Sequence, residues 1–292
     1  MSNSIEQRAQ ELSRSVRMLA LVGASLKLRS SPSADPAVRE QIDLGARMAL
    51  GVDPATINEQ QVPQLLTVIE MAFAEAGELL RHSERGAGWQ VEDVELLQTQ
   101  GRASRSVFTR ILSLAETRPL LREALNGTFL DVGTGVAGIA LEAARTCPNL
   151  QVDGIDIWEP ALALARKNVA ESPYSDRVRI MNLDISALAA EQRYSLVWLP
   201  TMFLKRSVLE QALDRIVVAS CSGAYLIAAL YTQPKDSFTA VLSTLRTMRS
   251  GGEVTDPSEL QDMLKSRGYT DLEVSVTPIA TFILGRRPSG VS

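Results

Sequence analysis

The 292-residue sequence predicts an α/β protein in which an all-helical region over residues 1–125 precedes a seven-stranded sheet domain over residues 126–292. Three observations predict this class. Apolar residues recur at helical spacing through the first region, which has no alternating β-branched run. After residue 126, short apolar strands alternate with helices, a pattern typical of a mostly parallel sheet covered on both faces. The last two strands are joined by a turn so short that they must pair antiparallel.

Four helices are expected in the first region. They span residues 5–28, 37–50, 61–84 and 91–116. Residues 30–36 contain two prolines and separate the first two helices, and Gly51 is a stop signal for the second. Leu12, Val16 and Leu19 place an apolar stripe on the first helix. Because such a stripe needs a partner, we expect the region to be a cap or lid on the second domain, a homodimer interface, or both.

The second region is expected to contain seven strands. The first five span residues 127–133, 150–157, 177–185, 194–200 and 223–231, and the last two lie within residues 272–287. The expected helices span residues 136–147, 159–172, 205–220 and 256–269. Asp256 with Pro257 is a cap signal at the start of the last helix. The five parallel strands should bring their carboxyl ends to one edge, where ligands of such sheets bind.

Composition narrows the function classes. The 45% hydrophobic content is ordinary for a globular protein, and the net charge of −4 with pI near 5.3 argues against a nucleic-acid partner. Cys147 and Cys221 alone cannot build a zinc site or a disulfide framework, so we expect no metal. No run reaches about 18 apolar residues, and the first residues lack the basic segment of a signal peptide. We expect a soluble, cytoplasmic protein with no membrane partner.

A glycine-rich turn lies between the first strand and the first helix of the second region. Its sequence, FLDVGTGVAGIA, spells G-x-G-x-x-G with Gly133, Gly135 and Gly138. Glycines let the backbone approach a ligand, and the following helix start offers free N–H groups. The turn by itself fits a dinucleotide or a different nucleoside ligand. Asp131, two residues before the first glycine, favours a ligand with a cationic group because it would repel a pyrophosphate.

Two further carboxylates end later strands at the same edge. Asp156 ends the second strand and can accept hydrogen bonds from both hydroxyls of a ribose. Asp184 ends the third strand and can accept from an adenine amino group. Each of the two could instead only cap the helix that follows, and Asp131 could be a buried structural carboxylate.

These residues resemble the class I S-adenosylmethionine-dependent methyltransferases. The blocks LDVGTGVAG, GIDIWEP, LDI and SLVWLP are similar to the successive blocks of that family, in order and at typical spacing, and the resemblance covers about residues 98–287. It implies a Rossmann-like seven-stranded domain whose antiparallel C-terminal hairpin inserts the seventh strand beside the sixth. Two positions depart from the pattern: Ala137 stands where many members have a third glycine, and Ser195 where an aspartate is common.

The resemblance implies S-adenosylmethionine as the cofactor. Asp131, Gly133 and Gly135 would flank its methionine part, and Arg102 would pair with its carboxylate unless it is an ordinary helix-surface charge. The full set of implied cofactor-binding residues is Arg102, Asp131, Gly133, Thr134, Gly135, Asp156, Ile157, Trp158, Asp184, Ile185 and Leu199. The expected substrate pocket is an apolar rim of Trp198, Met202, Phe203 and Tyr231. Trp158 and Trp198 could equally be core residues.

The expected reaction is methyl transfer to a small, partly hydrophobic molecule by proximity and orientation. No catalytic base is identified, since His82 is the single histidine and lies at an expected frayed helix end. Three alternatives remain: a cofactor-binding protein with a regulatory role, another reaction of the bound cofactor, and a nicotinamide oxidoreductase. An RNA methyltransferase is disfavoured because LPTMFL, residues 199–204, lacks the Asp/Asn-Pro-Pro-aromatic block of nucleic-acid amino methyltransferases.

Overall fold

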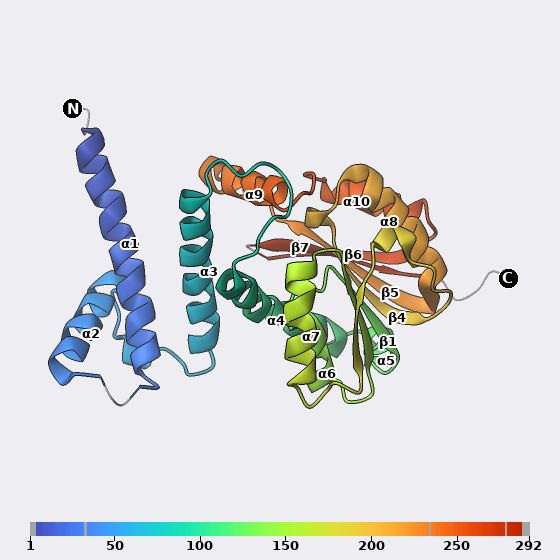
Figure 1. The fold of residues 1–292 in the computed structure, drawn as a ribbon, viewed down its shortest axis with the longest axis horizontal. Coiled ribbons are helices and arrows are strands. Elements are labelled where there is room, and N and C mark those ends of the chain that lie inside the picture. Colours follow the sequence, from blue (N-terminus) through green and yellow to red (C-terminus); the bar gives the residue numbers. More distant parts are fainter. Residues whose placement is uncertain (1–3, 32–33, 234, 278, 288–292) are drawn as a thin grey trace. The chain divides into compact units, whose positions relative to one another are not determined.

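The computed structural model describes residues 4–31, 34–233, 235–277 and 279–287 (Figure 1). The chain divides into two compact units, residues 1–83 and 84–292. This division lies before the fourth expected helix, so that helix belongs to the second unit. No helix in the described ranges is long and apolar enough to cross a membrane.

The N-terminal unit is helical, as predicted. Its elements are α1 (Ile5–Leu28), α2 (Pro36–Leu50), the 3-10 helix η1 (Pro54–Thr56) and α3 (Val62–Arg81). Asp35 caps α2 by accepting from the N–H groups of Ala37 and Val38. Gly51 ends α2 in the left-handed conformation, at φ +72°, which confirms the predicted stop. A small core around Leu26 joins the three α-helices.

The second unit contains the sheet and the helices around it. Before the sheet come α4 (Val94–Glu116) and α5 (Pro119–Ala124). The strands are β1 (Thr128–Val132), β2 (Gln151–Asp156), β3 (Val178–Asn182), β4 (Tyr194–Pro200), β5 (Ser220–Tyr231), β6 (Thr270–Val276) and β7 (Ala280–Arg286). The helices between them are α6 (Gly138–Thr146), α7 (Glu159–Ala170), η2 (Ile185–Ala187), η3 (Thr201–Phe203), α8 (Arg206–Ala219), α9 (Ser237–Arg249) and α10 (Pro257–Lys265).

The sheet confirms the predicted fold class. Its seven strands lie in the order β3-β2-β1-β4-β5-β7-β6, and the first five are parallel. β7 pairs antiparallel with both β5 and β6, so the last strand of the chain inserts beside the sixth. The carboxyl ends of β1, β2, β3 and β4 therefore share one edge, with β1 between β2 and β4.

Two α-helices of this unit, α5 and α9, have no counterpart in the predictions. α5 is only six residues long. α9 begins after Asp236, whose carboxylate accepts from the Thr239 N–H, yet its buried residues are Ser243 and Thr247. Phe238 and Val241 are exposed instead. Because the buried positions of α9 are polar, the periodicity of its apolar residues gives no signal for a core-facing stripe.

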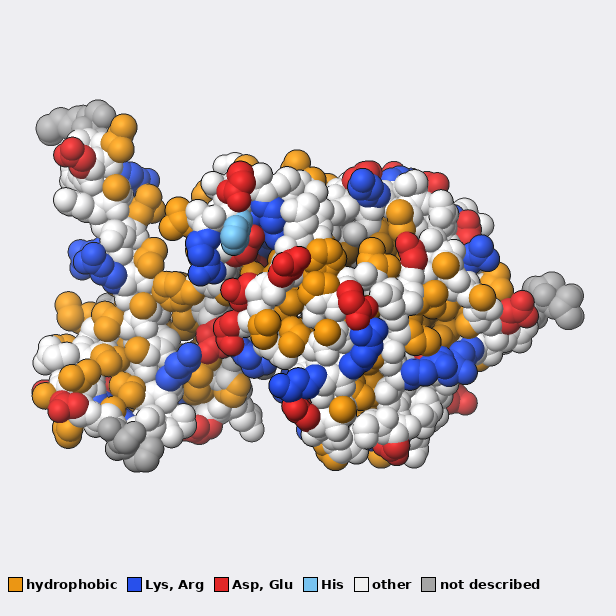
Figure 2. All heavy atoms as spheres, in the orientation of Figure 1, with side chains coloured by type: hydrophobic (Ala, Val, Ile, Leu, Met, Phe, Trp, Pro, Cys, Tyr) orange, Lys and Arg blue, Asp and Glu red, His pale blue; other side chains and the backbone are white. Residues whose placement is uncertain are grey.

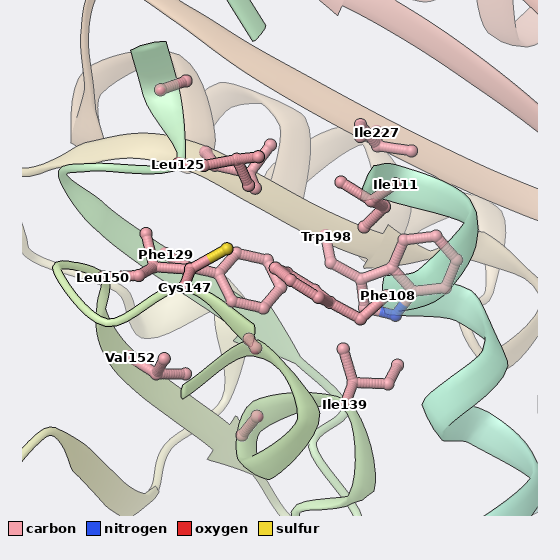
Figure 3. Packing of buried hydrophobic residues seen from close by; sticks show 14 of the residues in the cluster. Phe108, Ile111, Leu125, Phe129, Ile139, Cys147, Leu150, Val152, Trp198 and Ile227 are labelled. Carbon is pink, nitrogen blue, oxygen red and sulfur yellow. The ribbon is translucent and has the colours of Figure 1, made fainter. Parts of the chain in front are cut away.

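One hydrophobic core lies between the sheet and α4 (Figure 3). Phe108 and Ile111 of α4 are fully buried, and the Phe108 ring lies 5.6 Å from that of Phe129 on β1. Trp198 of β4 belongs to the same core: its side chain is 4% exposed and its ring lies 5.8 Å from Phe282 on β7. Trp198 thus lies in the core, which is one of the two positions open for it, and its side chain points from β4 toward α4. Its part in a substrate pocket stays a prediction.

A contact between two glycines fixes α4 on the glycine turn. A Cβ added to Gly101 would lie 2.1 Å from Cγ2 of Val136, and one added to Gly138 would lie 2.1 Å from the Gly101 carbonyl oxygen. Both positions therefore require glycine for close packing rather than for an unusual φ angle. The same face of α4 is held by a reciprocal amide pair between Gln98 and Asn168.

Replacing Gly138 by alanine should destabilise the second unit, because the new methyl group would meet backbone rather than a side chain that can rotate away. Overpacking of this kind costs about 1–3 kcal/mol or more. Urea unfolding followed by circular dichroism measures the loss. Gly86→Ala is the matched control, since a Cβ there meets nothing within 4 Å. Equal midpoints for the two variants would contradict the packing role of Gly138.

Candidate functional site

The glycine turn leaves β1 at the carboxyl edge and enters α6. Gly133 and Gly135 have φ angles of +66° and +56°, and Ala137 has +67°. Ala137 thus takes the left-handed conformation of the missing third glycine, whereas Gly138 serves helix packing. A Cβ on Gly135 would meet nothing within 4 Å. The turn is therefore open beside Gly135, where its backbone can approach a ligand.

Asp131 lies beneath the turn and is fully buried. Its Oδ2 accepts from the Thr134 hydroxyl at 2.8 Å, while Oδ1 has no hydrogen-bond partner among the described residues. Burial raises the pKa of Asp131 to about 7, and the nearby Asp156 carboxylate adds to the rise against the Thr134 hydrogen bond. A buried acceptor with an unfilled position is suited to a ligand that brings a positively charged donor.

Asp156 ties the end of β2 to the glycine turn. Its Oδ2 accepts from the Gly135 N–H at 2.8 Å, and its Oδ1 accepts from the N–H groups of Ile157 and Trp158 at 2.7 and 2.9 Å. Burial raises the pKa of the Asp156 carboxyl, although these three donors act in the opposite direction. The carboxylate therefore does cap the residues that follow it. Its role toward a ribose remains a prediction.

The residues beside Asp156 and Asp184 differ in exposure. Asp184 is exposed and caps η2 by accepting from the N–H and hydroxyl of Ser186 at 2.8 and 2.7 Å. Ile185 is buried, whereas Ile157 is 65% exposed at the end of β2. An apolar side chain so exposed at this edge is suited to cover a flat ring. Trp158 is half-buried, and its indole N–H donates to the Val91 carbonyl at 2.6 Å.

Arg102 makes its hydrogen bonds within its own helix, α4. Its Nη2 bonds Glu95 Oε1 at 2.9 Å and Thr99 Oγ1 at 2.6 Å, all on α4. This is the geometry expected of an ordinary helix-surface charge. Pairing of Arg102 with a cofactor carboxylate stays a prediction. Arg102 also borders a cavity of about 280 Å³ between α4, α6 and α7. A neighbour on α4, Gln100, has a buried Oε1 without a partner among the described residues.

Leu199, expected to bind the cofactor, and the expected substrate residues lie in different parts of the structure. Leu199 is fully buried in the core on the opposite side of the sheet from Trp198. Met202 and Phe203 form η3 just after β4, and Tyr231 ends β5 at the same edge. Among the described residues, no group of three or more His, Cys, Asp or Glu side chains is placed to hold a metal ion.

Sequence reasoning missed Trp89. Its ring lies 5.5 Å from that of Phe203 at an interplanar angle of 87°, an edge-to-face pair. Trp89 lies in the loop RGAGW before α4, where no periodicity marks it. A tryptophan that follows Gly86 and Gly88 in a loop was the available signal, because a loop has little structural need for so large an apolar side chain.

Comparisons with known proteins agree with this geometry. Residues 129–220 match the family described as Methyltransferase domain. The tRNA1(Val) (adenine(37)-N6)-methyltransferase of Porphyromonas gingivalis is 40% identical over 84 residues, which are 27% of this chain and 33% of that protein. The ubiquinone/menaquinone biosynthesis C-methyltransferase UbiE of Geobacter sulfurreducens is 40% identical over 79 residues, 24% of this chain and 31% of the relative. The chain thus spans about a third of the length of these curated relatives.

Solved structures resemble the chain over its whole length. An O-methyltransferase family protein from Burkholderia thailandensis has a TM-score of 0.66 at 14% identity and covers 99% of this chain and 100% of its own. Human N-acetylserotonin methyltransferase in complex with S-adenosylmethionine has a TM-score of 0.62 at 12% identity, with 99% of both chains covered. Together with the family match, this shared fold confirms the resemblance to class I methyltransferases.

Replacing Asp131 by asparagine should remove a pH dependence from the stability of the ligand-free chain. The carboxyl has a pKa of about 7 when folded, against about 3.9 in an unfolded chain. Between these values the folded state binds more protons than the unfolded state, so the free energy of unfolding falls as pH rises and levels off above about pH 7. From about pH 5 to about pH 8, wild-type Tm should fall relative to Asp131→Asn by on the order of 5 °C.

Thermal unfolding at several pH values measures this difference. Asp176→Asn, a change in an exposed turn, is the control and should leave the pH profile of the wild type intact. A Tm difference between Asp131→Asn and wild type that stays constant with pH would contradict this prediction. It would show that the Asp131 carboxyl is already ionised without a ligand and that neighbouring groups compensate its charge.

Proposed function

We propose that this chain, whose second unit carries a class I S-adenosylmethionine-dependent methyltransferase domain, transfers a methyl group from that cofactor to a small, partly hydrophobic molecule. The observation that carries the proposal is the buried Asp131 carboxylate, with its unfilled Oδ1, beneath the left-handed Gly133 and Gly135. An ammonium group fits this acceptor in charge and in hydrogen bonding, and the open backbone of the turn can accommodate the chain that bears it.

Different site residues would bind different parts of the cofactor. Asp131 with the glycine turn would hold the methionine part, Asp156 the ribose hydroxyls, and Ile157 one face of the adenine. Three N–H donors already fix the Asp156 carboxylate, so its orientation does not depend on the ligand. When bound, the cofactor supplies an electrophilic methyl group.

The chain itself would contribute position and exclusion of water. A rigid turn and a fixed carboxylate orient the cofactor, and the apolar residues after β4 exclude water from the acceptor side. We assign no catalytic base: the single histidine of the sequence, His82, follows α3 in the N-terminal unit. A mechanism based on proximity suits an acceptor whose nucleophilic atom is already free of its proton.

A small acceptor is supported from two directions. Met202 and Phe203 after β4, Trp89 beside them and Tyr231 at the end of β5 are apolar or aromatic. The structures that match nearly the whole chain include the O-methyltransferase family protein and the pyocyanin biosynthetic protein PhzM, the latter with a TM-score of 0.65 and 97% of both chains covered. The tRNA-modifying relatives favour RNA as a second candidate, but the match to the Porphyromonas gingivalis relative covers only 27% of this chain, and the net charge of −4 opposes RNA binding.

Incubation with S-adenosylmethionine labelled on its methyl group tests the proposal. We expect label to enter the small-molecule fraction of a cell extract and not total tRNA. Asp156→Ala should lose most of this activity, on the order of tenfold or more, because it removes the ribose acceptor and unties the Gly135 N–H. Asp176→Ala is the matched control. Transfer to tRNA would select the second candidate, and tight cofactor binding with no transfer to either fraction would favour a regulatory cofactor-binding protein.

We also propose a homodimer through the N-terminal helices. Ile5, Leu12 and Val16 of α1 are 89%, 62% and 54% exposed, and Figure 2 shows apolar side chains along this helix. Water contact with such a stripe is costly, and burial against a second copy would relieve it. Leu12→Glu with Val16→Glu should shift the sedimentation coefficient to that of a monomer, whereas Arg14→Glu, which changes charge on the same helix, should not. A monomeric wild type would contradict the proposal.

A further inference from the structure

A short segment before α4, Gly88–Val91, is fastened to the end of β4. Within this segment, here called the strap, Trp89 forms the edge-to-face pair with Phe203 of η3. Phe203 follows β4 directly, at the carboxyl edge. The strap thus contacts the acceptor side of the candidate site through one aromatic pair.

The other end of the strap is fastened beyond β2. The Val91 carbonyl accepts the indole N–H of Trp158 at 2.6 Å, and Trp158 is the second residue after Asp156. Val91 itself is buried, with 6% exposure. The strap therefore also contacts the side of the site where the adenosine would lie.

A third fastening holds the strap from the side of α9, which Figure 1 shows beside the loop that leads to α4. The Gly88 N–H donates to the Met248 carbonyl at 3.1 Å. Gly251, at φ +87°, packs so closely that an added Cβ would lie 3.3 Å from the Gly88 Cα. This fastening contains no residue assigned to the cofactor.

The strand order places the strap over β1. Because β1 lies between β2 and β4, the contacts of the strap with residues that follow β2 and β4 place it near the carboxyl end of β1. That end continues into Gly133, Gly135 and the site above Asp131. The C-terminal end of the strap is fixed, since α4 follows it and is locked on the glycine turn through Gly101. Its N-terminal end begins at Gly88, which has φ +117° and can act as a hinge.

We propose that the strap is the gate of the cofactor site, and that Trp89 and Val91 are positioning residues that hold it closed. This inference rests on the proposed function. Opening requires the aromatic pair and the two hydrogen bonds to break and Val91 to leave its buried position, whereas α4 stays in place. Cofactor enters and product leaves while the strap is open, so the strength of the fastenings sets both rates.

A gate has a kinetic signature that a ligand contact lacks. Loosening a gate raises the association and dissociation rate constants by the same factor and leaves Kd unchanged. Losing a contact to the ligand raises the dissociation rate constant alone. The two roles can therefore be separated with S-adenosylhomocysteine as the probe and without knowledge of the acceptor.

The experiment measures both rate constants by surface plasmon resonance on the immobilised full chain. Trp89→Ala removes the aromatic pair, and Gly251→Ala pushes against Gly88. Each should raise both rate constants by about fivefold, the equivalent of one net hydrogen bond, with Kd changed less than about twofold. Gly268→Ala is the matched control for Gly251→Ala, since Gly268 also has a positive φ, +82°, but open surroundings.

The outcomes separate the gate from the proposed function. A wild type that fails to bind S-adenosylhomocysteine overturns both. Binding whose rate constants are unchanged in Trp89→Ala and in Gly251→Ala overturns the gate and leaves the proposed function standing. A rise confined to the dissociation rate constant assigns these residues to ligand contact and likewise overturns the gate. Circular dichroism confirms that each variant is folded, and Trp89→Ala tests the proposal if Gly251→Ala does not fold.

Discussion

Two buried carboxylates on neighbouring strands dominate the energetics of the site. Burial raises the pKa of both Asp131 and Asp156, and the Asp156 charge raises the pKa of Asp131 further. Asp156 is compensated by three backbone donors, whereas Asp131 receives one hydroxyl. Because the charge of Asp131 lacks full compensation, the ligand-free site is unfavourable, and a cationic ligand would stabilise it. The open glycine turn matters because it lets such a ligand reach the place where the charge is unbalanced.

The fold and the carboxylates could be predicted because both are encoded locally. Strand and helix periods, the glycine turn and acids at strand ends depend on a few consecutive residues, and the insertion of the seventh strand beside the sixth followed from the resemblance. The directions of side chains that depend on distant partners could not be read in this way. Trp198 points at Phe108 and Ile111, which lie on a helix far earlier in the chain. Arg102 pairs with Glu95, which lies two turns earlier on the same helix. Trp89 meets Phe203 through tertiary folding alone.

The shared and unshared parts of the chain carry different information. The match to the methyltransferase domain spans residues 129–220, which include the glycine turn, Asp156, Asp184 and η3. Trp89, α4 and the hairpin β6–β7 lie outside it. The residues proposed to bind the cofactor thus lie largely in the segment that matches the methyltransferase domain. The residues that would shape the acceptor side and its access lie largely in segments where those relatives give no guidance.

The burial of α4 against the sheet has a consequence for how such a chain can be divided in evolution or in the laboratory. Phe108 and Ile111 fill the core beside Phe129 and Trp198, although the change from helices to strands comes only after Asn126. A fragment that began at that change would leave this apolar surface bare, and bare core surface promotes aggregation. The unit that can be separated from the N-terminal helices therefore begins near Glu84, and it contains α4 together with the sheet.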